Sequence, residues 1–206
     1  MKKVLKIIRI IILFGILISV GFYFYIKNYW KNFTNETEVD KFISEIKSSE
    51  KLPENFYTLY EVENHKALSN DLNMQMLKAI FNSNFIQPPS SQASFMFIFF
   101  SGKNLYRHRY KMAKTSLAWK IEKRTSQREC LNWLTENYDF LNNAKGIKEA
   151  SKLYFKKSIE ELSERELASL VIMLENSSLY NPFRRQKLID KRVQELLKKS
   201  KLLTEN

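Results

Sequence analysis

Residues 146–185 read GIKEASKLYFKKSIEELSERELASLVIMLENSSLYNPFRR and carry the strongest structural signals of the chain. From Gly146 onward, an apolar residue recurs at every third or fourth position, which is the period of an amphipathic helix. Ser163 followed by Glu166 is the S-x-x-E pattern of a capping box, and an apolar stripe follows it. An Asn-Pro pair at 181–182 ends the pattern, because a residue before proline avoids the helical conformation. The stretch therefore predicts consecutive helices.

The rest of the chain favours helices as well. Its 206 residues include only 4 Gly and 4 Pro, which argues against a turn-rich β-sandwich. Ser126 and Glu129 repeat the capping pattern, and no segment alternates apolar and polar residues with the period of a strand. Further helical segments are expected at residues 52–62, 72–81, 105–124, 126–138 and from 187 onward. The sequence therefore predicts an all-α domain.

A long apolar segment precedes this domain. Residues 10–26, IIILFGILISVGFYFYI, are 17 residues without a charge, and extension back to Ile7 gives 20 because Arg9 can reach the membrane interface. This length is enough to cross a bilayer core. Basic residues precede the segment and no small-residue cleavage motif follows it, so we expect a retained single-pass anchor with a cytoplasmic N-terminus. The alternatives are a cleaved signal peptide and a buried helix of a soluble protein.

The anchor divides the chain into three parts. Residues 1–31 are expected to form the cytoplasmic tip and the transmembrane helix, residues 32–51 a polar stalk or linker, and residues 52–206 the helical domain. Six of the 34 basic residues and none of the 22 acidic ones lie in residues 1–31. The remainder holds 28 basic and 22 acidic residues, a net charge of +6, so the domain itself is basic.

Basic residues are concentrated in one part of the domain, because residues 72–121 contain no Asp or Glu. A basic surface beside a membrane attracts anionic headgroups or phosphates. A solvated helix face is the alternative, and a nucleic-acid site does not fit a domain outside the cytoplasm. Residues 95–100, FMFIFF, lie in the same stretch. They are too few to cross a bilayer and predict a buried helix or a segment at the membrane interface.

Cysteine and histidine are scarce in this chain. Cys130 is the only cysteine, which excludes an internal disulfide and a cysteine-rich metal site. His65 and His108 are the only histidines, so a histidine-based metal site is not expected either. The sequence indicates no cofactor, and a divalent cation is compatible with it without being indicated.

Several short motifs follow one another within residues 146–185. They are Gly-Ile at 146–147, an alanine at 150, Tyr-Phe-Lys-Lys at 154–157, Glu-Leu-Ala at 166–168 and Tyr-Asn-Pro at 180–182. They resemble the G-I-x-x-A-A-x-x-Y-F-G-K, S-x-x-E-A-A-L-L-A and P-x-x-Y-N-P patterns of glycosyltransferase family 51. This is the peptidoglycan glycosyltransferase domain of class A penicillin-binding proteins and monofunctional transglycosylases. The resemblance covers most of residues 52–185 and implies a lysozyme-like helical domain that works on lipid II.

The resemblance also implies a reaction in which a sugar hydroxyl displaces a polyprenyl pyrophosphate. Such a reaction needs a carboxylate to accept the hydroxyl proton and cations to stabilise the departing pyrophosphate. The family's base lies in an E-D-x-x-F motif, which falls here on residues 63–67. Glu63 is therefore the candidate general base, with Asn64 in place of the aspartate. Glu61 is the rival in a shifted register, and an ordinary surface carboxylate is the alternative.

Other family positions differ in this sequence. The G-S-T-I-T-Q-Q-L-x-K-N motif falls on residues 90–100, where Ser91 and Ser94 remain as candidate substrate-binding hydroxyls and Phe99 replaces the phosphate-contacting lysine. The second family carboxylate falls on Asn132, whose amide keeps the shape without the charge. Cations near the motif are further candidates for pyrophosphate binding: Lys103, Arg107, Arg109, Lys111 and Lys114.

Two functions are compatible with this pattern. The first is a divergent membrane-bound glycosyltransferase that still polymerises lipid II through Glu63. The second is a catalytically inactive relative that binds lipid II, another anionic lipid or a cell-wall synthesis protein, and the missing motif residues favour it. An unrelated helical adaptor is a third alternative, and no nucleic-acid partner is expected. The predicted location is the bacterial cytoplasmic membrane, with the domain on its extracytoplasmic side.

Overall fold

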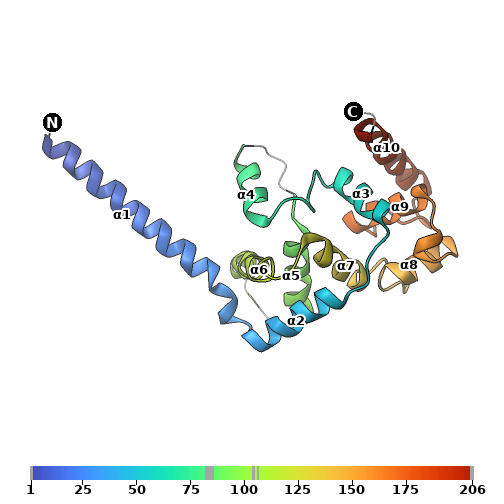
Figure 1. Ribbon diagram of the computed structural model, residues 1–206, viewed down its shortest axis with the longest axis horizontal. Coiled ribbons are helices and arrows are strands. Elements are labelled where there is room, and N and C mark those ends of the chain that lie inside the picture. Colours follow the sequence, from blue (N-terminus) through green and yellow to red (C-terminus); the bar gives the residue numbers. More distant parts are fainter. Residues whose placement is uncertain (1, 82–85, 104, 106, 205–206) are drawn as a thin grey trace.

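The computed structural model describes residues 2–81, 86–103, 105 and 107–204. All regular elements in this part of the chain are helices, which confirms the predicted all-α fold. Figure 1 shows α1 as a long rod that projects from a group of shorter helices. In chain order the elements are α1 (Lys2–Lys27), the 3-10 helix η1 (Tyr29–Asn32), α2 (Glu36–Ser48), α3 (Glu54–Glu63), α4 (Leu72–Phe81), α5 (Pro89–Phe100), α6 (Arg107–Ile121), α7 (Gln127–Asn137), α8 (Ile147–Phe155), the 3-10 helix η2 (Ile159–Glu161), α9 (Glu164–Glu175) and α10 (Gln186–Thr204).

The helix α1 coincides with the predicted membrane anchor. Its residues Val4–Lys27 are long and apolar enough to cross a membrane by length and composition. Its last turn is attached to α6, because the Ser116 hydroxyl donates to the Lys27 carbonyl oxygen at 3.1 Å and accepts from the Trp30 backbone N–H at 2.8 Å. The anchor therefore ends directly on the helical domain.

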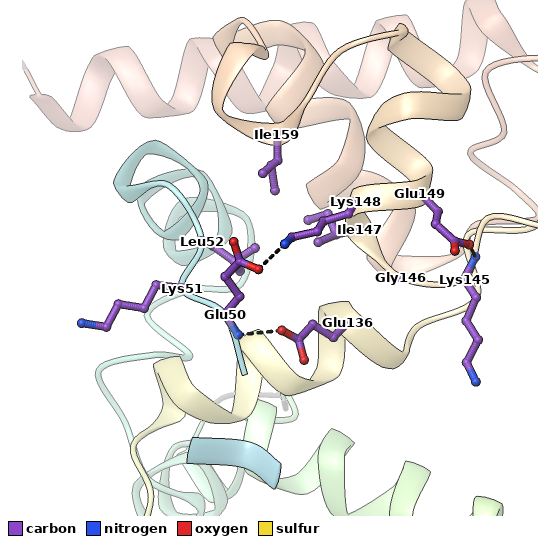
Figure 2. A pocket seen from close by; sticks show the side chains of 10 residues that line it. All are labelled: Glu50, Lys51, Leu52, Glu136, Lys145, Gly146, Ile147, Lys148, Glu149 and Ile159. Atoms are coloured by element: carbon purple, nitrogen blue, oxygen red, sulfur yellow. Dashed lines mark hydrogen bonds and ion pairs between the residues drawn. The ribbon is translucent and has the colours of Figure 1, made fainter. Parts of the chain in front are cut away.

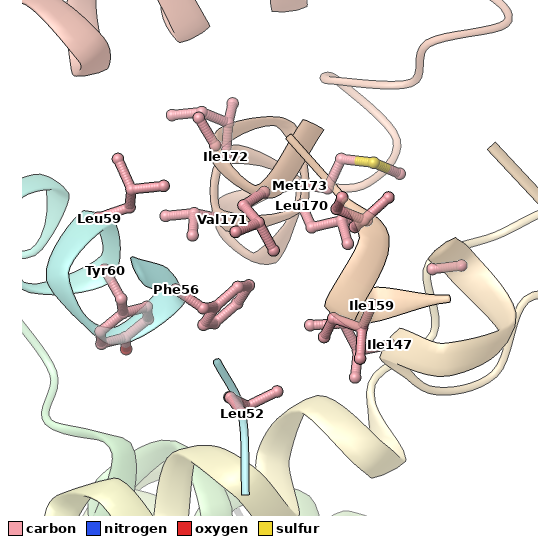
Figure 3. Packing of buried hydrophobic residues seen from close by; sticks show 14 of the residues in the cluster. Leu52, Phe56, Leu59, Tyr60, Ile147, Ile159, Leu170, Val171, Ile172 and Met173 are labelled. Atoms are coloured by element: carbon pink, nitrogen blue, oxygen red, sulfur yellow. The ribbon is translucent and has the colours of Figure 1, made fainter. Parts of the chain in front are cut away.

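One hydrophobic cluster lies where α3 packs on α9, with α10 against both helices. Phe56, Leu59 and Tyr60 of α3 lie opposite residues 170–173 of α9 (Figure 3). α3 presents one apolar face to this cluster. α9 is instead buried on all sides, because its consecutive residues 170–173 are all buried and neighbouring residues of a helix are about 100° apart. The packing fixes the end of α3, where Glu63 lies, against α9 and α10.

The helix starts predicted from local patterns are present. Ser126 with Glu129 and Ser163 with Glu166 both form complete capping boxes. Gly146 precedes α8 with a φ of +87°, and a side-chain carbon there would lie 2.6 Å from the Glu136 carbonyl oxygen. Both the backbone conformation and this close approach require glycine.

A second hydrophobic cluster includes the segment expected to form a stalk. The helix α2 packs on α7, and the Phe42 ring stacks on the ring of Phe97 in α5 at a centroid distance of 4.5 Å. The mostly polar composition of residues 32–51 does not predict this packing. The few apolar residues all lie on one face of the helix, and that face is enough to pack on the domain. α2 therefore packs on the domain instead of standing apart from it. Its buried side chains are Val39, Phe42, Ile43 and Ile46.

The FMFIFF segment forms the second half of α5. Ile98 is buried, whereas Phe95, Phe99 and Phe100 expose 46%, 68% and 53% of their surface. The expectation of a buried helix is therefore wrong for one face of this segment. Phe95 and Phe99 are four residues apart, so they lie on the same side of the helix and their rings stack at 6.4 Å.

Candidate functional site

A polar cavity of about 720 Å³ lies between α3, α9, α10 and the start of α5, and Glu63 lines it. Glu63 is the last residue of α3, and α9 and α10 pack against that helix. The volume is within the range of small-molecule sites. Most of the other lining side chains are polar or charged: Tyr60, Asn64, His65, Gln87, Gln92, Glu175, Arg192 and Lys199.

Cations of α10 hold Glu63 in this cavity. Nη2 of Arg192 donates to Oε1 of Glu63, and Nζ of Lys199 lies 3.9 Å from Oε2. The Glu63 side chain is 9% exposed, and its Oε2 has no hydrogen-bond partner among the residues that the structure describes. One carboxylate oxygen is thus occupied, whereas the other is buried beside the cavity and has no donor in the described residues.

The geometry favours Glu63 over Glu61 as the candidate base. Glu61 does not line the polar cavity, although it lies on the same helix. Its Oε1 accepts a hydrogen bond from the Ser69 hydroxyl at 2.5 Å, and its Oε2 is buried without a partner in the described residues. The two carboxylates therefore differ in their relation to the cavity and not in having an unpaired oxygen.

Asn132 does not join Glu63 in the cavity. Its side chain is buried at 4% exposure, and its Oδ1 accepts a hydrogen bond from the Tyr57 hydroxyl at 2.6 Å. The same hydroxyl accepts from the Leu52 backbone N–H at 3.1 Å. Asn132 therefore ties α7 to the start of α3, and the structure does not bring the two candidate catalytic positions together.

The two candidate serines are also buried. Ser91 and Ser94 lie on α5 at 1% and 0% exposure, and neither lines the polar cavity. Ser94 Oγ has no hydrogen-bond partner within the described part of the chain. Direct contact between these hydroxyls and a ligand in the cavity is therefore not supported by the geometry.

The structure brings some of the predicted cations together at one cavity and places others elsewhere. Lys103 pairs with Glu38 of α2 at 2.6 Å, and Arg109 lies on α6. Arg107 is the first residue of α6, and its side chain lies outside the described residues. Lys111 and Lys114 line an apolar cavity of about 440 Å³ together with three aromatic residues: Phe95, Phe99 and Tyr110.

Lys114 connects this aromatic cavity with the polar one. Its Nζ donates to Oε1 of Gln87 at 3.0 Å, and Gln87 lines the polar cavity. Burial lowers the pKa of Lys114 below its ordinary value, and the nearby charge of Lys111 lowers it further. An anion between the two cavities would offset both effects.

A further cavity of about 240 Å³ lies between the end of α7, the start of α8 and residues 50–52. Figure 2 shows that its three glutamates are engaged, because Glu50 meets Lys148 and the other two accept from backbone N–H groups. Glu50 pairs with Lys148, and Glu136 accepts the Glu50 backbone N–H at 2.6 Å. None of the predicted site residues lines this cavity, and no role in the candidate site is assigned to it.

Comparison with protein families identifies the domain. A family model described as Transglycosylase matches residues 72–201, which is more than half of the chain. The chain belongs to the transglycosylase family. Comparison with curated proteins found no match. The transglycosylase match includes α4 to α9 and most of α10, so it confirms the family resemblance carried by residues 146–185.

The transglycosylase match covers only some of the candidate site residues. It contains Ser91, Ser94, Asn132 and the candidate cations, whereas Glu61 and Glu63 precede its first residue. The placement of Glu63 in the polar cavity therefore depends on the structure and not on the match. In the described residues of this transglycosylase domain, no group of three or more His, Cys, Asp or Glu could hold a metal ion.

Sequence reasoning missed the contribution of the last helix to the cavity. Arg192 and Lys199 both line it, and they are seven residues apart, so they share one face of α10. That spacing was the signal present in the sequence. It could not identify Glu63 as their partner, because the Arg192 contact joins residues 129 positions apart.

Proposed function

We propose that this membrane-anchored member of the transglycosylase family binds lipid II in bacterial cell-wall synthesis, with little or no polymerising activity. The observation that carries the proposal is the position of Lys114 between the polar cavity and the aromatic cavity. Lipid II has sugars, a pyrophosphate and a polyprenyl chain in that order. A polar cavity, a pair of lysines and an aromatic cavity follow one another in the same order.

Loss of catalytic groups supports binding over polymerisation. Phe99 stands at the position of the phosphate-contacting lysine and is largely exposed, and Asn132 is buried away from Glu63. Positioned acid–base groups and electrostatic stabilisers each contribute roughly a hundredfold or more to enzymatic rates. Their loss should therefore lower turnover by several orders of magnitude while a binding surface remains.

The membrane topology belongs to the same proposal. α1 would cross the bacterial cytoplasmic membrane once, with the basic N-terminal residues in the cytoplasm and the domain outside. Since α1 ends on α6, the domain would lie close to the headgroups, where lipid II and other anionic lipids are available. Cell-wall synthesis proteins are further candidate partners of the exposed surface.

Binding can be measured with the full chain in nanodiscs that contain lipid II. Lys114→Gln should weaken binding about tenfold, because one charge-assisted contact to the pyrophosphate is lost. Lys123→Gln, which removes an exposed lysine just after α6, is the matched control and should bind normally. Equal affinity for wild type and Lys114→Gln would refute the proposed path of the ligand.

Residual polymerisation through Glu63 is the second candidate function. It is favoured by Oε2 of Glu63, a buried acceptor beside the polar cavity with no partner in the described chain. Purified protein incubated with lipid II, followed by electrophoresis of glycan strands, separates the two functions. Glycan strands that disappear in Glu63→Gln would establish the enzyme, whereas binding without strands supports the lipid-binding function.

A further inference from the structure

The carboxylate of Glu63 is anchored by a residue that belongs to the last helix. Arg192 lies on α10, and its Nη2 donates to Oε1 of Glu63, the last residue of α3. Glu63 is 9% exposed and Arg192 is 24% exposed, so water competes weakly for this pair. A charged hydrogen bond in such surroundings is stronger than one on an open surface.

Arg192 is itself held by carboxylates from two other positions. Its Nη1 donates to Oε2 of Glu195 at 3.0 Å, and its Nη2 lies 3.5 Å from Oε2 of Glu175. The three acids come from α3, α9 and α10. Burial lowers the pKa of Arg192, but the hydrogen bond to Glu195 and the charge of Glu63 raise it above its ordinary value. The planar guanidinium is thus a fixed and permanently charged support.

The two oxygens of Glu63 are left in different states by this support. Oε1 is occupied by Arg192, whereas Oε2 has Lys199 at 3.9 Å and no hydrogen-bond partner in the described residues. Rotation of the carboxylate would break the Arg192 contact. Oε2, a buried atom beside the polar cavity, is therefore the oxygen that keeps acceptor capacity for a donor that reaches it.

We infer that Arg192 is a positioning residue, which holds Glu63 by one oxygen and presents the other to the ligand. The inference rests on the proposed function for the identity of the ligand, but not for the orientation of Glu63. It makes α10 a part of the site, although the motifs of the sequence lie elsewhere. The packing of α10 on α3 then decides whether the Glu63 carboxylate is oriented.

Carboxyl footprinting of the full chain tests the orientation directly. The folded protein in detergent is treated with a carbodiimide and glycine ethyl ester, and modification of each Glu is quantified by mass spectrometry. Arg192→Gln should increase modification of Glu63 severalfold, because both oxygens become free to rotate toward the cavity. Arg192→Lys keeps the charge and should restore part of the protection.

Glu195→Gln is the matched control. It removes the charge of another partner of Arg192 but leaves the Arg192–Glu63 contact, so Glu63 should stay protected. Unchanged modification of Glu63 in Arg192→Gln would overturn the inference. Equal increases at Glu63 and at Asp190, which pairs with Arg165 of α9 at 2.6 Å and is measured in the same experiment, with no protection restored by lysine, would also overturn it, since they would indicate that α10 had merely detached.

Lipid II binding by the same variants separates this inference from the proposed function. Arg192→Gln should weaken binding about tenfold, and Arg192→Lys should recover part of the loss. Wild-type protein that binds no lipid II, together with the expected footprinting pattern, would reject the proposed function and retain the positioning role. Normal binding by Arg192→Gln would reject the positioning role for this ligand.

Discussion

Glu122 shows how one partly buried carboxylate joins four segments of the domain. Its Oε1 accepts hydrogen bonds from the Ser90 hydroxyl at 2.6 Å, the Gln127 side-chain amide at 2.7 Å and the Leu72 backbone N–H at 3.0 Å. Burial raises its pKa above the ordinary value, although these hydrogen bonds oppose the shift. The residue therefore links the starts of α4, α5 and α7 to the end of α6.

The raised pKa of Glu122 predicts a pH-dependent stability. Between the unfolded-state pKa of about 4.3 and the higher folded-state value, the folded protein binds more protons than the unfolded one. The free energy of unfolding contributed by Glu122 should therefore fall as pH rises through this window. Urea unfolding in detergent from pH 4 to 8 measures this contribution as a difference. The free energy of unfolding of wild type minus that of Glu122→Gln, which keeps the acceptor oxygen without a charge, should decrease as pH rises.

Two further variants control this comparison. Glu164→Gln makes the same chemical change at an exposed position and should reproduce the wild-type curve. Glu122→Ala leaves three donors without their acceptor and should cost about 1–3 kcal/mol at every pH. A difference between wild type and Glu122→Gln that does not change with pH would contradict the role of titration.

At the scale of elements, features that depend on residues close in sequence could be predicted, whereas contacts between helices distant in sequence could not. The capping boxes at Ser126 and Ser163 depend on residues three positions apart, so the sequence contains all of their information. The contact between Arg192 and Glu63 depends on how α10 packs on α3, and no local pattern encodes it. The burial of α2 was missed for a related reason, because its composition is mostly polar.

The end of α8 offers a test at this scale. Lys156 caps the helix in the left-handed conformation, with a φ of +60°, where the family pattern has glycine. Lys156→Gly should raise the free energy of unfolding by about 1 kcal/mol, because glycine adopts this conformation without steric cost. Chemical denaturation measures the difference.

A matched variant separates the backbone effect from the lysine side chain. Lys156→Ala removes the contact between Lys156 Nζ and the Leu153 carbonyl oxygen at 3.1 Å, but it keeps the strained backbone. It should give no gain in stability. Equal stabilisation by alanine and glycine would show that the lysine side chain, and not φ, is the cause.

At the scale of the whole molecule, the exposed aromatic face of α5 is expected to contact the membrane. Phe95 and Phe99 lie beside Lys111 and Lys114 of α6, and α6 is the helix on which the anchor ends. Aromatic side chains with neighbouring lysines are typical of surfaces that enter the headgroup region of anionic bilayers. Phe183 is also exposed, but it lies beside Tyr154 of α8, at the end of the domain away from α1 (Figure 1).

Fluorescence quenching in proteoliposomes tests this contact. A probe on Phe99→Cys should be quenched by brominated lipids, whereas the same probe on Phe183→Cys should not be. Burial raises the pKa of the native Cys130 thiol to about 12, so the reagent should label the introduced cysteine alone. Equal quenching at both positions, or at neither, would rule out a specific contact of the aromatic face.

The two hydrogen bonds of Ser116 would also affect how the proposed lipid ligand reaches the domain. Because this side chain contacts both Lys27 and Trp30, rotation of the domain about the end of α1 is restricted. With α1 across a membrane, the cavities would stay at one height and one tilt relative to the bilayer. A molecule that diffuses laterally in the same leaflet would search for them in two dimensions and arrive already oriented, which favours capture of a scarce lipid even when each contact is weak.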